Sequence, residues 1–110
     1  MQVPFELTTA SNGQFRFSLR TAEGDTLLNS ETYVQKASAQ NGIESVQSNS
    51  GNEARYDRLT ASDGRAYFNL KAGNGQVIGT SPMFATEAAR DAAVAATMTE
   101  GSSTRIDDKT

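Results

Sequence analysis

Apolar and polar residues alternate along short stretches of this chain, and the stretches occur twice. Residues 15–20 read Phe-Arg-Phe-Ser-Leu-Arg, with Phe15, Phe17 and Leu19 on one side of an extended strand. Alternation of period 2 is typical of a half-buried antiparallel strand. Residues 11–19 have a counterpart in residues 62–70, at an offset of 51 positions. The chain is therefore predicted to contain one structural unit written twice.

Each repeat is predicted to hold three strands joined by turns of the form X-Gly. The expected strands are residues 5–9, 15–20, 25–29, 56–60, 66–71 and 76–80. The expected turns are Asn12-Gly13, Glu23-Gly24, Asp63-Gly64 and Asn74-Gly75. Gly adopts positive φ without a steric penalty, so a dipeptide of this kind favours a tight hairpin. Four turns at corresponding places predict two three-stranded meanders.

A helix is expected after each meander, at about residues 35–48 and 86–99. In the first, Ala39, Ile43 and Val46 fall on one helical face. The second is rich in Ala, which favours helix intrinsically, and Thr86 is a suitable N-cap residue. Residues 105–107 are expected to form a short terminal strand, followed by a frayed end.

These elements define an α+β fold, in which tandem β-β-β-α(-β) repeats form a single antiparallel sheet with two helices packed on one face. Residues 1–110 are expected to form one domain, with repeats at about 3–53 and 54–108, because half the chain is close to the lower limit for an independent core. The predicted inward residues are Phe5, Leu7, Phe15, Phe17, Leu19, Leu27, Ile43, Val46, Phe68, Leu70, Ile78 and Val94.

Composition excludes several kinds of chemistry. The chain has no Cys and no His, so disulfides, His/Cys zinc sites, Cys nucleophiles and Ser-His-Asp triads are excluded. No cofactor and no metal site are expected. The formal net charge of −3 is spread over both halves, and general attraction to nucleic acid or to an anionic membrane is not expected. With no visible signal peptide or membrane-spanning run, the expected location is the cytoplasm.

Several phrases of the sequence together resemble one known family. They are Asn12-Gly13-Gln14-Phe15-Arg16-Phe17, Ser30…Tyr33…Lys36-Ala37, Asn41-Gly42-Ile43-Glu44-Ser45-Val46, Tyr67-Phe68-Asn69-Leu70-Lys71-Ala72 and Asn74-Gly75-Gln76-Val77-Ile78-Gly79. The chain resembles the YegP-like family over essentially its whole length. The resemblance implies β3-α-β units in a single sheet, with the final strands exchanged between units. The family has no established function, so no site residues can be carried over.

The two repeats match the family pattern unequally. Residues 93–97 read Ala-Val-Ala-Ala-Thr where the family usually has Gly-Ile-x-Ser-Val, a pattern that residues 42–46 keep. Residues 23–27 read Glu-Gly-Asp-Thr-Leu where Asn-Gly-Gln-x-Ile is typical, as at residues 74–78. A role of the better-matched copy of each motif therefore need not be shared by the corresponding residues of the other repeat.

The outward row of the second strands is the candidate surface patch. It comprises Arg16, Arg20, Tyr67 and Lys71, with Ser18 and Asn69 between them. Cations and aromatic rings on an open sheet face can hold single-stranded nucleic acid. A solvated sheet face explains the same residues without any ligand. Binding through the patch would weaken steeply with salt.

Other features have structural explanations. A strand, not a helix, follows Gly73-Asn74-Gly75, which favours a hairpin over a phosphate loop. Asp107-Asp108 lacks further carboxylates at metal-binding spacing, and Lys36 has no matching amine in the second repeat. Tyr33 and Phe84 precede the two helices at equivalent positions, which indicates packing at the helix start.

Three functions remain open. The favoured hypothesis is a small non-enzymatic binding or structural module, for which a structure without a deep polar pocket would be expected. A well-formed pocket lined by Tyr33 or Phe84 and charged residues would count against it. The alternative is single-stranded nucleic-acid binding through the patch. The third is an enzyme that uses Asp/Glu, Lys or Tyr, although no pair is placed for acid–base work. Partners are unknown, and the chain is expected to be mainly monomeric, with its repeats paired within the molecule.

Overall fold

The computed structural model describes residues 4–21, 23–103 and 105–110. The expected start of the first repeat at residue 3 lies outside these residues. In chain order the elements are β1 (Phe5–Thr9), β2 (Phe15–Arg20), β3 (Thr26–Ser30), α1 (Lys36–Asn49), a 3-10 turn (Glu53–Arg55), β4 (Tyr56–Thr60), β5 (Ala66–Lys71), β6 (Val77–Thr80), α2 (Glu87–Glu100) and β7 (Ile106–Asp108). The predicted elements are thus confirmed, with boundaries shifted by one residue or less.

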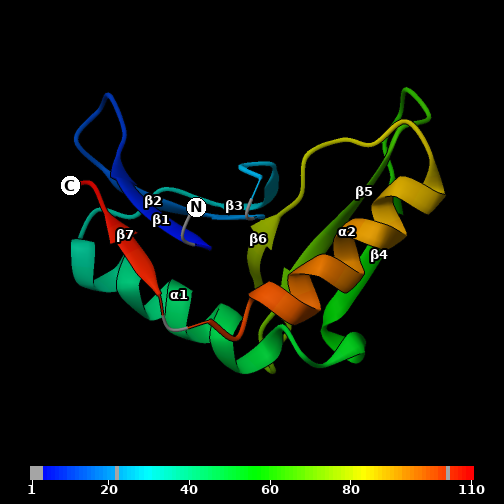
Figure 1. Ribbon diagram of the computed structural model, residues 1–110. Helices are drawn as coiled ribbons and strands as arrows, with labels where there is room; N and C mark the ends of the chain where they lie inside the picture. Colours follow the sequence, from blue (N-terminus) through cyan, green and yellow to red (C-terminus); the bar gives the residue numbers. More distant parts are fainter. Residues whose placement is uncertain (1–3, 22, 104) are drawn as a thin grey trace.

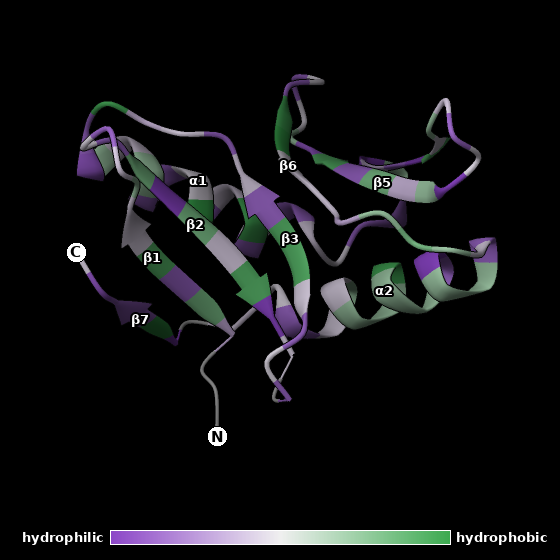
Figure 2. Cartoon of the chain, turned by 90° about the horizontal axis from the view of Figure 1, so that it is seen from above, coloured by the Kyte–Doolittle hydropathy of each residue, from purple (hydrophilic) through white to green (hydrophobic). Residues whose placement is uncertain are grey.

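All strands belong to one seven-stranded sheet in the order β4-β5-β6-β3-β2-β1-β7. The sheet is strongly twisted, and both helices lie on the same side of it (Figure 1). Each meander is antiparallel, and the two meanders meet where β3 pairs antiparallel with β6. Figure 2 shows hydrophilic and hydrophobic residues alternating along β1 and β2, as the period-2 pattern predicts. The α+β class and the tandem repeats are confirmed.

The sheet is mixed, and not wholly antiparallel as predicted. Strand β7 runs parallel to β1, with Ile106 opposite Phe5. The chain leaves α2 near the start of β1 and therefore continues in the direction of β1. The chain end is also held and not frayed as expected, because the Lys109 N–H donates to the Leu7 carbonyl at 2.8 Å and Lys109 Nζ lies 3.1 Å from Glu6 Oε2.

A pseudo-two-fold axis relates the two repeats. Asn29 and Thr80 occupy equivalent positions, 51 residues apart, and lie directly opposite each other at the centre of the sheet. The C-terminal ends of the helices also meet, because Ser50 contacts its equivalent Gly101. The axis therefore passes between β3 and β6 and between the ends of α1 and α2.

The helices and the inner sheet face enclose one cluster of buried side chains from both repeats. Every predicted inward residue is buried except Phe15, which is half-buried at the start of β2. Leu28 is fully buried and was not predicted. A register irregularity between Leu19 and Arg20 breaks the alternation of β3 against β2, so Leu27 and Leu28 are both buried.

At two places near the axis, one of two equivalent residues is Gly because a second side chain would not fit. A Cβ on Gly79 would lie 2.8 Å from Leu28 Cγ, and Leu28 is the residue of the first repeat that corresponds to Gly79. A Cβ on Gly101 would lie 2.4 Å from Ser50 Cβ, and these two positions are also equivalent. One repeat therefore supplies the side chain and the other supplies Gly, which explains why the two copies differ here.

Candidate ligand-binding groove

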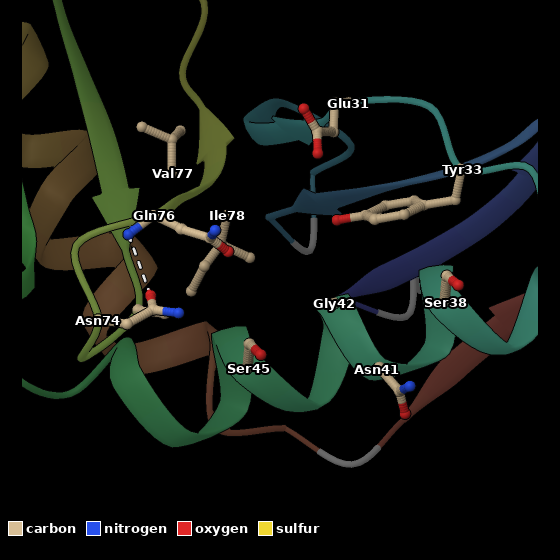
Figure 3. A pocket seen from close by; sticks show the side chains of 11 residues that line it. Glu31, Tyr33, Ser38, Asn41, Gly42, Ser45, Asn74, Gln76, Val77 and Ile78 are labelled. Carbon is tan, nitrogen blue, oxygen red and sulfur yellow. Dashed lines mark hydrogen bonds between the residues drawn. The ribbon is translucent and has the colours of Figure 1, made fainter.

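A pocket of about 250 Å³ opens between α1 and the hairpin that joins β5 to β6. We call it the α1–hairpin groove. Three segments line it, namely the linker after β3, one side of α1 and the hairpin (Figure 3). Its residues are Glu31, Tyr33, Ser38, Asn41, Gly42, Ser45, Ala72, Asn74, Gln76, Val77 and Ile78. The first repeat supplies one wall and the second repeat supplies the other.

The groove exists because the two central strands diverge. The register of β3 and β6 covers two pairs, Asn29 with Thr80 and Ser30 with Gly79. Beyond Ser30 the chain turns toward β2, where Tyr33 exchanges backbone hydrogen bonds of 2.6 and 2.7 Å with Phe15. The wedge between the strands is closed at the Ser30–Gly79 pair and open at the other end, with α1 beneath it.

Gly42 lets Tyr33 lie close to α1. A Cβ at Gly42 would lie 2.8 Å from the Tyr33 hydroxyl oxygen and 2.7 Å from Phe17 Cε2. The Tyr33 ring stacks on Phe17 with centroids 6.4 Å apart and an interplanar angle of 9°. This packing fixes the ring, and Figure 3 shows its hydroxyl directed across the groove toward the hairpin.

The Tyr33 hydroxyl stays protonated at neutral pH. Burial raises the pKa of Tyr33 above its usual value, and the nearby Glu31 carboxylate raises this pKa further. A protonated phenol can both donate and accept a hydrogen bond.

Three carboxamides, Asn41, Asn74 and Gln76, and two hydroxyls, Ser38 and Ser45, supply most of the other polar atoms of the groove. The Asn74 Oδ1 accepts a hydrogen bond of 3.1 Å from the Gln76 backbone N–H, which fixes the turn and leaves the Asn74 amide group to donate. Ile78, Val77, Ala72 and Gly42 contribute apolar surface. The groove thus offers donors and acceptors beside a small apolar patch.

Glu31 supplies the single formal charge among the lining residues. The cation of Lys36, at the start of α1, is engaged elsewhere, 2.7 Å from Asp108 Oδ2. An anionic ligand would therefore meet a carboxylate and no cation among the lining residues. The arrangement favours a ligand that is neutral or positively charged.

The equivalent positions of the other repeat have a different chemistry. Ser38, Asn41 and Ser45 of α1 correspond to Ala89, Ala92 and Ala96 of α2. Tyr33 corresponds to Phe84, which lacks a hydroxyl, and Asn74 and Gln76 correspond to Glu23 and Asp25. The pseudo-two-fold axis therefore brings the polar helix of one repeat together with the amide-bearing hairpin of the other on one side only.

The structure places Arg16, Arg20, Tyr67 and Lys71 on the outer sheet face, away from the helices. Strands β3 and β6 separate β2 from β5, which sets the two halves of the patch about 14 Å apart. Arg20 lies 3.7 Å from Glu6 and Lys71 lies 2.7 Å from Asp57. The face is therefore less positive than the four residues alone indicate.

The remaining candidates have structural partners. Lys36 holds the pKa of Asp108 low, at about 2. Asp107 lies 3.7 Å from Lys109. In the part of the chain that the structure describes, no three His, Cys, Asp or Glu side chains lie together as metal ligands. None of the described helices is long and apolar enough to cross a membrane.

Gly73-Asn74-Gly75 forms a hairpin turn as predicted, with Gly75 at a φ of 86°. Sequence reasoning did not place this turn beside Asn41 and Ser45, because the contact joins different repeats across the axis. One indication was available. The two motifs of the groove are the better-matched copies, at residues 42–46 and 74–78, whereas their partners have diverged.

The comparisons with known proteins agree with this architecture. The model of a domain of unknown function (DUF1508) matches twice, at residues 10–57 and 61–108. The chain belongs to this family and contains its domain twice. It is 49% identical over 106 residues to the UPF0339 protein YegP of Escherichia coli K12, covering 96% of each chain. It is 47% identical to the UPF0339 protein ACIAD0721 of Acinetobacter baylyi, with the same coverage.

Two solved structures share the fold. The solution NMR structure of E. coli yegP, described as a protein of unknown function, superimposes with a TM-score of 0.91 at 48% identity, covering 96% of this chain and 90% of that one. The NMR structure of UPF0339 protein SO3888 from Shewanella oneidensis gives a TM-score of 0.90 at 49% identity, covering 94% and 88%. The names of these relatives assign no enzymatic activity.

Proposed function

We propose that this protein is a non-enzymatic binding module that holds a small ligand in the α1–hairpin groove. The sequence hypothesis combined a binding role with a purely structural one and expected no deep polar pocket, least of all one lined by Tyr33 and a charged residue such as Glu31. The groove, with its several polar groups, favours the binding role. Its titratable side chains are the Glu31 carboxylate and the Tyr33 phenol, and the pKa of Tyr33 is raised further from neutrality, so the pocket gives little support to acid–base catalysis at neutral pH.

The observation that carries this proposal is the difference between the two repeats. Both copies of the unit form the same fold, and α2 does so with Ala89, Ala92 and Ala96. The hydroxyls and the carboxamide of Ser38, Asn41 and Ser45 are therefore not required by the fold. Each lowers intrinsic helix stability by about 0.5 kcal/mol relative to Ala. A ligand in the groove supplies a reason for retaining them.

Titration followed by two-dimensional NMR of the amide groups tests the proposal. The probes are glycinamide, N-acetylglucosamine, cytidine and spermidine, which are small polar compounds without negative charge. At least one is expected to shift the amides of Asn41, Ser45 and Gln76, because these residues line the groove. Citrate, as an anionic control, is expected to leave them unchanged. Failure of all four probes to move these signals at tens of millimolar would refute the proposal.

Binding of single-stranded nucleic acid through Arg16, Arg20, Tyr67 and Lys71 is the alternative proposal. The ion pairs of Arg20 with Glu6 and of Lys71 with Asp57 reduce the charge that a phosphate backbone would meet. No contact on the outer sheet face favours nucleic-acid binding over the simpler interpretation that these side chains are exposed to solvent. The groove is therefore the better-supported site.

A further inference from the structure

The negative charge of Glu31 is available to a ligand. The ion pairs among the described residues involve other carboxylates and do not include Glu31. Its side chain lies at the mouth of the groove, beside Tyr33 (Figure 3). An unpaired carboxylate at the rim of a partly enclosed neutral pocket attracts a cation more strongly than it would in open water.

The side-chain amide groups of the groove can form hydrogen bonds with an amide group of a ligand. Asn74 can donate from its side chain, because its oxygen is held by the turn, while Gln76 and Asn41 can both donate and accept. The Tyr33 hydroxyl points toward the hairpin between these groups. A peptide bond also presents a donor and an acceptor in one plane, and it can be bound from both walls.

The shape of the groove selects the end of a chain. The wedge is closed where Ser30 pairs with Gly79, so an extended chain cannot run through it at that end. A volume of about 250 Å³ is below the range of about 300–1,000 Å³ that drug-sized ligands occupy. The apolar contribution of Ile78, Ala72 and Gly42 leaves room for a small side chain only.

We infer that the groove binds a primary ammonium group followed by an amide, the chemistry of a free peptide N-terminus. Glu31 pairs with the ammonium group, and Asn74, Gln76 and Tyr33 bind the first peptide bond. Free amino acids are disfavoured, because their carboxylate would meet no cation in the groove. This inference rests on the proposed function and names the ligand class for the same site.

Four ligands distinguish the sources of this chemistry by NMR titration of the full chain. They are glycyl-alanine amide, its N-acetylated form, glycyl-alanine with a free carboxylate, and an eight-residue peptide amide beginning with Gly-Ala. Acetylation removes the positive charge and is expected to weaken binding at least tenfold. The free carboxylate is also expected to weaken it. If glycyl-alanine amide and the eight-residue peptide amide bind with equal affinity, the site recognises small amines. If the eight-residue amide binds more tightly, the site recognises peptide ends.

Glu31→Gln provides the matched test in the protein. This substitution is expected to weaken the binding of glycyl-alanine amide at least tenfold and to leave the affinity for the acetylated dipeptide unchanged. Glu44→Gln is the control, since Glu44 is an exposed residue of α1 that does not line the groove. Equal affinity for free and acetylated dipeptides, or an unchanged affinity in Glu31→Gln, would overturn the inference. Groove shifts caused by N-acetylglucosamine or cytidine alone would overturn it and leave the proposed function standing.

Discussion

A chain that ends at Glu53 is expected to have no stable monomeric fold. In the full chain β3 pairs with β6, and β1 is covered by β7, so truncation opens both edges of the first meander. It also removes residues of the second repeat, such as Phe68 and Val94, from the shared core. We therefore propose that residues 1–110 fold as one unit. Sedimentation and circular dichroism at micromolar concentration measure the result.

The half-chain has one way to compensate, which is to pair with itself as a domain-swapped dimer does. Such a dimer would place Leu28 against Leu28 and Ser50 against Ser50, where the full chain has Gly79 and Gly101. We therefore expect mainly unfolded chain, and a folded dimer only after both residues are changed to Gly. A folded monomeric half-chain would show that the repeats are independent domains.

Gly101→Ala is expected to lower the free energy of unfolding by about 3 kcal/mol, at the upper end of typical overpacking costs. The new Cβ would lie 2.4 Å from both Ser50 Cβ and Ser50 Oγ, and 2.8 Å from the Thr97 carbonyl oxygen. These atoms belong to packed helix ends and cannot move aside easily. The backbone of Gly101 has a φ of −66°, so the cost arises from the contact and not from the conformation. Urea unfolding measures the change.

Ser50→Gly is the control for this prediction. It removes the Cβ that the added methyl group of Gly101→Ala would strike, and also the Ser50 Oγ, a buried atom without a hydrogen-bond partner among the described residues. The double variant is expected to recover more than half of the lost stability, because the two positions are in direct contact. Additive effects of the two substitutions would contradict the proposed meeting of equivalent residues at the axis.

The sequence was sufficient for the local structure of each repeat. The alternation of Phe15, Phe17 and Leu19 predicted β2, and the X-Gly turns predicted every hairpin, since these features depend on neighbouring residues. The Thr86 cap was also predictable, and its hydroxyl oxygen accepts a hydrogen bond of 3.1 Å from the Ala89 N–H. The parallel placement of β7 was not predictable, because pairing between strands that are distant in the sequence leaves no local pattern.

The candidate sites show the same limit. Alternation placed Arg20 and Lys71 on the outer face, but their pairing with Glu6 and Asp57 depends on neighbouring strands. The groove depends on the divergence of β3 from β6 and on a helix and a hairpin from different repeats. Its residues could be suspected from the sequence only by comparing the two copies position by position.

The most direct test of the account replaces the polar groove face of α1 with that of α2. The variant Ser38→Ala, Asn41→Ala, Ser45→Ala is expected to unfold at the same or a higher urea concentration, with a gain of up to about 1.5 kcal/mol from helix propensity. It is also expected to lose the NMR shifts at Gln76 that are caused by whichever of the four small probes bind the unmodified chain.

A control variant, Gln40→Ala with Ser48→Ala, changes exposed residues of α1 outside the groove and should gain stability while keeping those shifts. Both quantities are measured on the same sample of each variant. The account predicts a stable triple variant that no longer responds to the probes. A triple variant that is destabilised by more than about 1 kcal/mol, or that binds the probes as before, would contradict it.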